Sequence, residues 1–483
     1  MRTFEIPIRL DPHRALPAFT RLASAPEPGT RLTTELIHEH GSFRLEDCII
    51  GSYRNEELYV TDDQSVLGRA YLPYHDGIFW LEADENLARG VQYALDLCRL
   101  FNVRQLSLLG YPVCQARRQM GHDFTHNRHI HTSDVYAIGL LLAHNLGVVG
   151  DDLTALRLAL LIHDGFTPAG GDAMKFVDKD AFDEDARLSE LLDDEAWIEL
   201  CVRCGVFPEL PIRICQEKDG LLAQIRDLAD TLAYVSRDLH QLAGFTREKY
   251  VPAWHEDDET RRLAAVLGQI ASIPNAFTLW ESVRRSRDGR SIVVENHRRL
   301  ETFLRARALL FRLLYYNRQA RNVEYIIGIR LVQELMKDGL ITVDDCIRSR
   351  GKCSIDELLW HFVEEQTGYN PDHWHRGQRG MTDTFQTLPE AKQNAMRWTT
   401  KHHCAIIYRW PSATKTKTSS WLVEKGGVEM PWSEAYPNRS ADIESIMHTP
   451  TCYWVARIHR DHLSRLRPAW WKRLHELACA PLS

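Results

Sequence analysis

A long stretch with helical periodicity constrains the fold of this chain more than any other feature. From about residue 101 to about residue 340, apolar residues recur at the three- and four-residue spacing of amphipathic helices almost throughout, most strongly in residues 221–242. Helices with one apolar stripe must bury it against other helices. We therefore predict a mainly α fold, built around a helical bundle at residues 101–340.

The segments on either side of this bundle have a different pattern. Alternating stretches at residues 42–60 and 69–83 are typical of strands, and an amphipathic helix is expected near Glu85 to Phe101. After residue 340 the composition shifts toward Gly, Pro, Thr and Trp, with strand-like runs at His403–Trp410 and Cys452–Ile458. We expect an N-terminal mixed accessory region at 1–100, a helical core at 101–340 and a C-terminal α+β accessory or regulatory region at 341–483.

Candidate metal ligands occur at three places in the predicted bundle. His131 lies in a short basic stretch, His163 and Asp164 directly follow an apolar helical run that ends at Ile162, and Asp230 lies in the strongest helical segment. Neighbours within a helix point about 100° apart, but at a frayed helix end both can turn toward one ion. Imidazoles and carboxylates hold a hard or borderline divalent cation and leave positions for water and a phosphoryl oxygen. The sequence therefore predicts a metal centre suited to phosphate chemistry.

The segment that carries Asp230 also places two further polar residues on the same helix face. Asp230, Tyr234 and Asp238 recur every four residues. Such a stripe could set a metal ligand, a ring and a hydrogen-bond acceptor along a bound nucleotide. The alternative is a solvated helix face.

The ordered set of motifs resembles the HD-domain phosphohydrolases, and within them the deoxynucleoside triphosphate triphosphohydrolases, which include bacterial dGTPases and the SAM-and-HD-domain dNTPase. The resemblance runs from about Arg104 to Asp238 and more faintly to about Glu334. Leu109-Gly110 and residues 124–132 (FTHNRHIHT) are similar to the family's "LG … HNRxxHS" segment. His163-Asp164 matches the HD pair, so the resemblance implies an HD-domain helical bundle.

The resemblance also implies roles for individual residues. His131, His163, Asp164 and Asp230 would be the metal ligands, and Arg128 a phosphate-binding cation. Tyr234 and Asp238 would pack against and hydrogen-bond the deoxyribose. Residues 284–330 carry twelve arginines against four acidic residues, and the resemblance makes Arg318 and Arg321 clamps for the polyphosphate. A solvated face or a subunit contact explains most of these arginines equally well.

The sequence departs from the family in the turn after the HD pair. Thr167 and Asp172 stand where the triphosphohydrolases have histidines, and Gly171-Asp172 is closer to the HD 5′-deoxynucleotidases, which act on monophosphates. Leu108 replaces a sugar-contacting glutamine of the SAM-and-HD-domain enzyme.

Proton transfer in such a site needs a carboxylate near the attacking water, and the phosphoryl charge needs a cation. Asp172 is the first candidate for the proton-handling group, with Asp183 and Glu184 in reserve; Lys175 and Arg128 are the candidate phosphate clamps. A solvated helix start with acids in its first turn is the alternative for Asp183 and Glu184.

The number of histidines sets the expected number of ions. Dinuclear HD proteins need further histidines between the HD pair and the last aspartate, and none occurs from Gly165 to Ala229. We therefore expect one divalent metal ion. The ligand types do not distinguish manganese, magnesium, iron and zinc.

Composition adds limits on setting and partners. The sequence has no apolar run of about 18 residues and no charged-then-apolar leader, so we expect no membrane association. The eleven cysteines are odd in number and scattered, which favours reduced thiols and a cytoplasmic setting. The pair Cys201-x-x-Cys204 stands alone in a helical context, so we interpret it as structural. A net charge of −7 argues against broad coating of nucleic acid. The basic segment at residues 412–427 predicts an exposed loop or β-ribbon that could dock single-stranded nucleic acid or form an oligomer interface. The resemblance also allows a nucleotide-sensing regulatory site there.

Together these features predict a metal-dependent phosphohydrolase of nucleotides. The expected reaction converts a deoxynucleoside triphosphate and water to a deoxynucleoside and tripolyphosphate, in a homo-oligomer. The alternatives are a 5′-deoxynucleotidase acting on monophosphates, an HD-type nuclease acting on single strands, and a non-catalytic nucleotide sensor.

Overall fold

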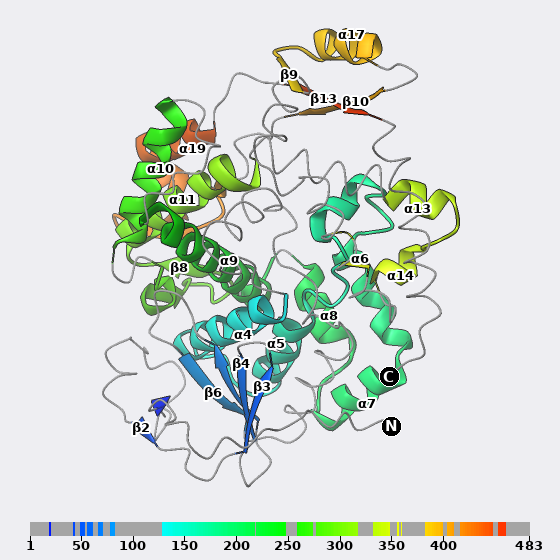
Figure 1. Ribbon diagram of the computed structural model, residues 1–483. Coiled ribbons are helices and arrows are strands. Elements are labelled where there is room, and N and C mark those ends of the chain that lie inside the picture. Colours follow the sequence, from blue (N-terminus) through cyan, green and yellow to red (C-terminus); the bar gives the residue numbers. More distant parts are fainter. Residues whose placement is uncertain are drawn as a thin grey trace.

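The computed structural model describes most of the chain from residue 128 onward. It covers residues 128–217, 219–247, 258–273, 277–316, 332–347, 355–356, 359, 382–398, 403–409, 416–447 and 453–459, and before residue 128 the backbone of six short strands. Within these residues the fold is mainly α, as the periodicity predicts, with four small sheets (Figure 1). The helix expected near Glu85 to Phe101 lies outside the described residues.

Helices account for most of the region from residue 128 to the middle of the chain. Its α-helices are α4 (Arg128–Asn145), α5 (Gly150–Ile162), α6 (Glu184–Arg187), α7 (Glu195–Arg203), α8 (Glu209–Gln216), α9 (Leu221–Arg247), α10 (Asp258–Ala271) and α11 (His297–Leu310). Shorter 3₁₀ or π turns are η2 (Gly171–Phe176), η3 (Leu188–Asp193), η4 (Leu279–Ser282) and η5 (Phe311–Tyr315), and two short helices follow, α13 (Gln333–Lys337) and α14 (Val343–Ile347).

The bundle is organised around α9, the longest described helix. α4, α5, α8, α10 and α11 all pack against it, and α4 and α5 also pack against each other (Figure 1). Their facing sides are apolar: Leu142 of α4, Leu160 of α5 and Leu232 of α9 are completely buried. The α4–α5–α9 layer therefore fixes the relative positions of the three segments that carry the predicted metal ligands.

Gly139 allows α4 to approach α5 closely. A Cβ atom at this position would lie 2.4 Å from Cδ1 of Leu160. The closeness is a consequence of interdigitated packing, in which there is no space for an added methyl group.

Gly139→Val is expected to lower the free energy of unfolding by about 1–3 kcal/mol, because the added side chain overpacks the α4–α5 contact. Urea denaturation followed by circular dichroism measures this loss. Gly150→Ala serves as a control, because it replaces a glycine where an added Cβ meets nothing within 4 Å. Its φ of +62° adds some backbone strain but no steric clash. Unchanged stability of the valine variant would contradict the packing described.

The sheets confirm most of the strand predictions. The N-terminal strands β3 (Ile49–Tyr53), β4 (Glu56–Val60), β5 (Val66–Ala70) and β6 (Ile78–Glu82) form an antiparallel meander beside α4, and β1 (Phe19–Thr20) pairs with β2 (Ser42–Phe43). A C-terminal sheet joins β9 (Thr382–Phe385), β10 (His403–Arg409) and β13 (Tyr453–His459), and α17 (Leu388–Trp398) packs on it.

The basic segment at residues 412–427 is only partly an exposed loop. In its described part, β11 (Leu422–Lys425) and β12 (Val428–Pro431) form a hairpin through Gly426-Gly427, both with positive φ as a tight hairpin turn requires. Trp421 is buried, as are Thr416 and Thr418. The prediction of exposure was therefore wrong for these three residues, because the segment packs on the helical core.

The hairpin connects the C-terminal region to the core. β11 pairs in parallel with β8 (Ile292–Val294), which itself pairs with β7 (Val283–Arg285), and α18 (Trp432–Ala435) and α19 (Pro437–Met447) follow, with α19 packed on α11. Residues on both sides of the predicted boundary at residue 340 thus share one sheet and one hydrophobic core. In the described part of the chain, none of the helices has the length and hydropathy needed to cross a membrane.

Candidate metal centre

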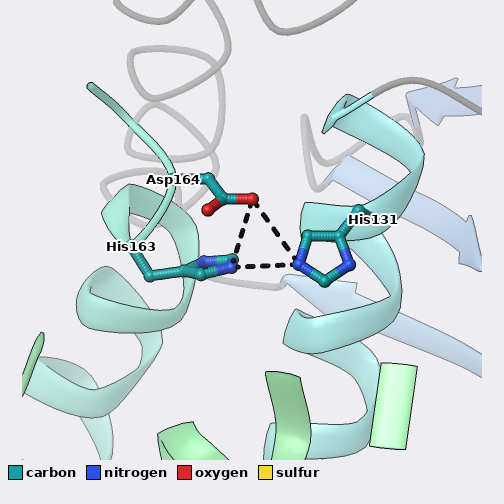
Figure 2. Close-up of side chains that lie close together, drawn as sticks. All are labelled: His131, His163 and Asp164. Atoms are coloured by element: carbon teal, nitrogen blue, oxygen red, sulfur yellow. Dashed lines mark hydrogen bonds and ion pairs between the residues drawn. The ribbon is translucent and has the colours of Figure 1, made fainter. Parts of the chain in front are cut away.

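Three of the four predicted metal ligands meet in one buried cluster. His131 lies in the first turn of α4, His163 caps the C-terminus of α5, and Asp164 follows it (Figure 2). His163 Nε2 lies 3.4 Å from His131 Nε2, and Asp164 Oδ2 lies 3.5 Å from the His131 nitrogen and 3.6 Å from the His163 nitrogen. All three residues are less than 10% exposed, so the cluster could hold a metal ion.

Asp230 joins the cluster from one side. It lies on α9, and its Oδ1 is 3.0 Å from His131 Nε2. It does not belong to the compact group of three whose ligand atoms all lie within 4.8 Å of one another. With its side chain 28% exposed, Asp230 is the most exposed of the four predicted ligands.

The sequence explains why adjacent residues can both reach the ion. α5 ends at Ile162, so His163 and Asp164 lie where the helix unwinds, as predicted. His163 Nδ1 is 2.8 Å from the carbonyl oxygen of Leu160. A protonated Nδ1 donating to this carbonyl leaves the Nε2 lone pair directed into the cluster, which is the usual arrangement of a metal-binding histidine.

The spacing and charge of these groups fit a divalent cation. Donors about 2.0–2.2 Å from one ion lie about 3.0–3.6 Å from each other, which is the range of the measured separations. Burial opposes protonation of His131, but its hydrogen bond with Asp230 and the charges of Asp164 and Asp230 outweigh burial and raise its pKa. The cluster therefore attracts positive charge.

Arg128 is engaged by one of the ligands. Its Nη1 donates to Asp164 Oδ2 at 2.7 Å, and both side chains are about nine-tenths buried. Burial alone would raise the pKa of Asp164, but the guanidinium, with His163 and His131, holds it far below its usual range. Arg128 thus keeps Asp164 ionised and oriented, and it also lies at the first turn of α4 beside the cluster.

The turn after the HD pair carries a second polar cluster, which we call the Lys175 cluster: Lys175, Asp172, Glu184 and Thr167. Lys175 Nζ donates to Asp172 Oδ1 at 3.1 Å and to Glu184 Oε1 at 2.9 Å. The completely buried Thr167 donates its hydroxyl to Glu184 Oε2 at 2.7 Å. Thr167 N–H bonds the carbonyl of Asp164 at 2.9 Å, which connects the Lys175 cluster to the metal centre.

The three acidic candidates have different positions in the structure. Asp172 is about half exposed and lies one 3₁₀ turn from Lys175 on η2, where residues i and i+3 face the same side. Glu184 is 17% exposed and contacts Thr167 and Lys175. Asp183 is the N-cap of α6 and accepts from the backbone N–H of Ala186. Asp183 is therefore an acid at a helix start, as the alternative interpretation of Asp183 and Glu184 expected. Glu184 instead belongs to the Lys175 cluster.

Residues beyond 340 hold this turn in place. Buried Asp356 accepts a hydrogen bond from Gly170 N at 2.8 Å, and Cys346 O accepts one from Ala169 N at 2.8 Å. Gly170 has a φ of +81°, a conformation that glycine adopts without strain. The turn that carries Asp172 and Lys175 is thus anchored by a part of the chain that the sequence did not connect with the site.

The predicted stripe on α9 faces protein groups that were not predicted. Tyr234 OH accepts from Arg307 Nε at 2.9 Å, and Asp238 Oδ2 accepts from the hydroxyl of Tyr315. Arg307 lies on α11 and is 3% exposed, and its guanidinium lies 4.5 Å from the ring centroid of Phe311. Sequence reasoning missed Arg307 among twelve arginines, and no local signal distinguishes it. The Tyr234–Asp238 face is not a solvated helix face, because Asp238 is 1% exposed.

Asp238→Asn is expected to remove a pH dependence of stability. Burial raises the pKa of Asp238 to about 7, although the Tyr315 hydroxyl opposes the shift. The folded protein then keeps a proton between about pH 4 and pH 7 that the unfolded chain releases, so stability falls as pH rises through this window, by on the order of 4 kcal/mol. The asparagine variant should lose this part of the pH dependence and be more stable than the original at pH 8. Denaturant unfolding at pH 5 and pH 8 measures the free energy of unfolding of each protein. If this free energy changed by the same amount between the two pH values in both proteins, Asp238 would not be a buried acid with a raised pKa.

Arg318 and Arg321 lie outside the described residues. Cys201 and Cys215 are buried thiols whose pKa burial raises to about 12, and within the described residues neither they nor Cys204 form a disulfide. The structural interpretation of the Cys201–Cys204 pair agrees with these positions.

Comparison with known proteins supports the fold. No family model matches the sequence, and no curated protein matches it at a significant level. A hypothetical protein from Aquifex aeolicus is similar in structure over 85% of this chain and 100% of its own, with a TM-score of 0.50 and 17% identity. A phosphohydrolase from Bacteroides thetaiotaomicron matches over 76% of this chain and 94% of its own, with a TM-score of 0.47 and 14% identity. The similarity to the Aquifex protein is one of fold.

Proposed function

We propose that this protein is a metal-dependent phosphohydrolase of nucleotides, with a deoxynucleoside triphosphate as substrate and a deoxynucleoside and tripolyphosphate as products. The observation that carries the proposal is the buried convergence of His131, His163 and Asp164 from two helices, with Asp230 beside them on a third. Nitrogen and oxygen donors at this spacing suit one divalent cation.

The chain's own residues prepare this centre for phosphate chemistry. A bound divalent ion would supply Lewis acidity toward a phosphoryl oxygen and lower the pKa of a water molecule. Arg128 orients Asp164 through its buried hydrogen bond. The backbone carbonyl of Leu160 orients His163. Burial of both imidazoles excludes bulk water from one side of the reacting group and strengthens every charge interaction there.

The α9 stripe supports a nucleotide rather than a simple phosphate ester. Tyr234 and Asp238 follow Asp230 at one and two helical turns, so a ligand at the metal centre would extend along them. Arg307 meets this stripe at Tyr234, and its Nη1 has no hydrogen-bond partner among the described residues. A buried guanidinium with an unsatisfied end is costly unless an anion binds it, and a phosphate tail would provide that anion.

A deoxynucleoside monophosphate is the second candidate substrate, and the Lys175 cluster favours it. Lys175, a predicted phosphate clamp, is already bound by Asp172 and Glu184. The charge of the Lys175 ammonium is therefore already neutralised, so Lys175 offers little attraction for a long polyphosphate. The similarity of Gly171-Asp172 to the 5′-deoxynucleotidases points the same way.

Product analysis tests the proposed function directly. The purified protein is incubated with Mn²⁺ and each deoxynucleoside triphosphate or monophosphate, and the products are separated by anion-exchange chromatography. Tripolyphosphate with free deoxynucleoside is the expected result. Orthophosphate from monophosphates alone would establish the second candidate, shortened oligonucleotides in a parallel incubation would indicate a nuclease, and binding without any product would indicate a nucleotide sensor.

Arg307→Met is expected to raise KM for the triphosphate about 10- to 100-fold, because a charge-assisted hydrogen bond to the phosphate tail is worth about 1.5–3 kcal/mol. Methionine keeps much of the aliphatic volume beside Phe311 and Tyr234. Steady-state kinetics measure the change, with Arg298→Met as a control, since Arg298 is an exposed arginine on the same helix. An unchanged KM would remove Arg307 from the substrate site.

A further inference from the structure

The Lys175 cluster contains a proton donor, the Lys175 ammonium, which has no role in the metal centre described so far. Lys175 Nζ lies within hydrogen-bond distance of Asp172 Oδ1 and Glu184 Oε1, at 3.1 and 2.9 Å. Its side chain is 37% exposed. The ammonium is thus held by two carboxylates and still reaches the solvent side of the turn.

The cluster adjoins the metal centre through two connections. Thr167 bonds Asp164 through its backbone N–H and Glu184 through its hydroxyl. Arg128, which donates to Asp164, also interacts electrostatically with Glu184 and Asp172. The turn that carries the Lys175 cluster is therefore joined to the residue Asp164 of the metal centre.

The charge of the cluster determines which substrate oxygen it suits. Lys175 is already neutralised by Asp172 and Glu184, and these two carboxylates repel the negatively charged non-bridging phosphoryl oxygens. The ester oxygen that bridges phosphorus and the sugar is uncharged in the substrate and gains negative charge only as its bond to phosphorus breaks. A proton donor at this oxygen keeps the leaving alcohol neutral, so the repulsion does not develop.

We infer that Lys175 donates its proton to the leaving-group oxygen, and that Asp172 and Glu184 hold it in place for this step. The inference rests on the proposed function. As the water oxygen forms its bond to phosphorus, the bond from phosphorus to the 5′ oxygen breaks, and its electron pair goes to that oxygen. The Nζ proton moves to the same oxygen, so the deoxynucleoside leaves as a neutral alcohol. The attacking water's proton passes to solvent, and Lys175 regains a proton from solvent.

These roles differ from those expected from the sequence, in which Asp172 handles the proton and Lys175 binds phosphate. Asp172 and Glu184 accept hydrogen bonds from an ammonium, and an ionised carboxylate has no proton to give. Burial lowers the pKa of Lys175, but Glu184 and Asp172 outweigh burial and raise it well above its ordinary value. The donor therefore carries its proton at neutral pH.

A change of leaving group tests this step. The hydrolysed nucleotide is compared with the same nucleotide in which sulfur replaces the bridging 5′ oxygen, because a thiolate is a much weaker base than an alkoxide and leaves without a proton. Lys175→Met is expected to lower kcat for the oxygen substrate about 10²- to 10⁴-fold and to lower kcat for the sulfur substrate less than about tenfold. Lys179→Met, an exposed lysine in the same segment, should change neither.

The outcomes separate the two levels of the proposal. Equal losses on both substrates would show that Lys175 binds phosphate or supports the fold, and would overturn the inference while the proposed function stands. Absence of hydrolysis of either substrate by the unmodified protein would overturn both. Bound-metal content and thermal unfolding of Lys175→Met should match those of the unmodified protein, and loss of the metal would also count against the assigned role.

Discussion

Replacing His163 with alanine is expected to lower phosphohydrolase activity at least about 10³-fold and to reduce the bound metal to a small fraction. Mutating a hydrogen-bond partner of a metal ligand typically costs about 10- to 100-fold, and loss of the ligand itself costs more. His163 is the cleanest test, since removing Asp164 would also leave the buried Arg128 without its acceptor. The variant loses one of three donors in the cluster while the Arg128–Asp164 pair is kept.

The measurements are initial rates with saturating Mn²⁺ and metal content by elemental analysis after removal of free ion. His297→Ala provides the matched control, because His297 begins α11, stacks on Tyr436 and is not part of the metal cluster. Its activity and metal content should equal those of the unmodified protein. Full activity of the His163 variant would refute the assigned metal centre, and with it the observation that carries the proposed function.

Asp134→Ala is expected to destabilise the fold by about 3–5 kcal/mol, the largest effect on stability that we predict. Arg237 on α9 donates to both carboxylate oxygens of Asp134 on α4 through Nε and Nη2, each at 2.5 Å. Asp134 is 1% exposed and the Arg237 side chain 12%. Removing Asp134 takes from the buried Arg237 guanidinium its bidentate acceptor, and breaking such a buried pair costs far more than the pair itself contributes.

Urea denaturation measures the loss, and a double variant tests its cause. Asp134→Leu with Arg237→Met replaces both charges with apolar groups and should recover most of the stability. Glu199→Ala, which breaks the exposed Glu199–Arg203 pair on α7, should change stability by less than about 0.5 kcal/mol. If Asp134→Ala were equally mild, Asp134 and Arg237 would not fix α4 against α9. Since α4 carries His131 and α9 carries Asp230, a shift between these helices should also weaken metal binding.

Local physical chemistry determined several features that the sequence predicted. The mainly α fold follows from three- and four-residue periodicity, and the strands near residues 403 and 453 follow from alternation, because both patterns are properties of neighbouring residues. The end of α5 at Ile162 follows from the end of the apolar helical run before the polar pair His163-Asp164. The grouping of His131 with His163 and Asp164 came from the resemblance to HD-domain proteins, and the structure brings these three residues together.

Tertiary structure decided the features that depend on contacts between distant residues. Asp356 lies 186 residues from Gly170 and anchors its turn, and Arg307 lies 73 residues from Tyr234 and bonds its hydroxyl. Lys175 and Glu184 were predicted as separate candidates, but only the folded turn pairs them. Sequence patterns record the periodicity of an element and the identity of its residues. The partner of a buried charge depends on how the elements pack, which no local pattern records.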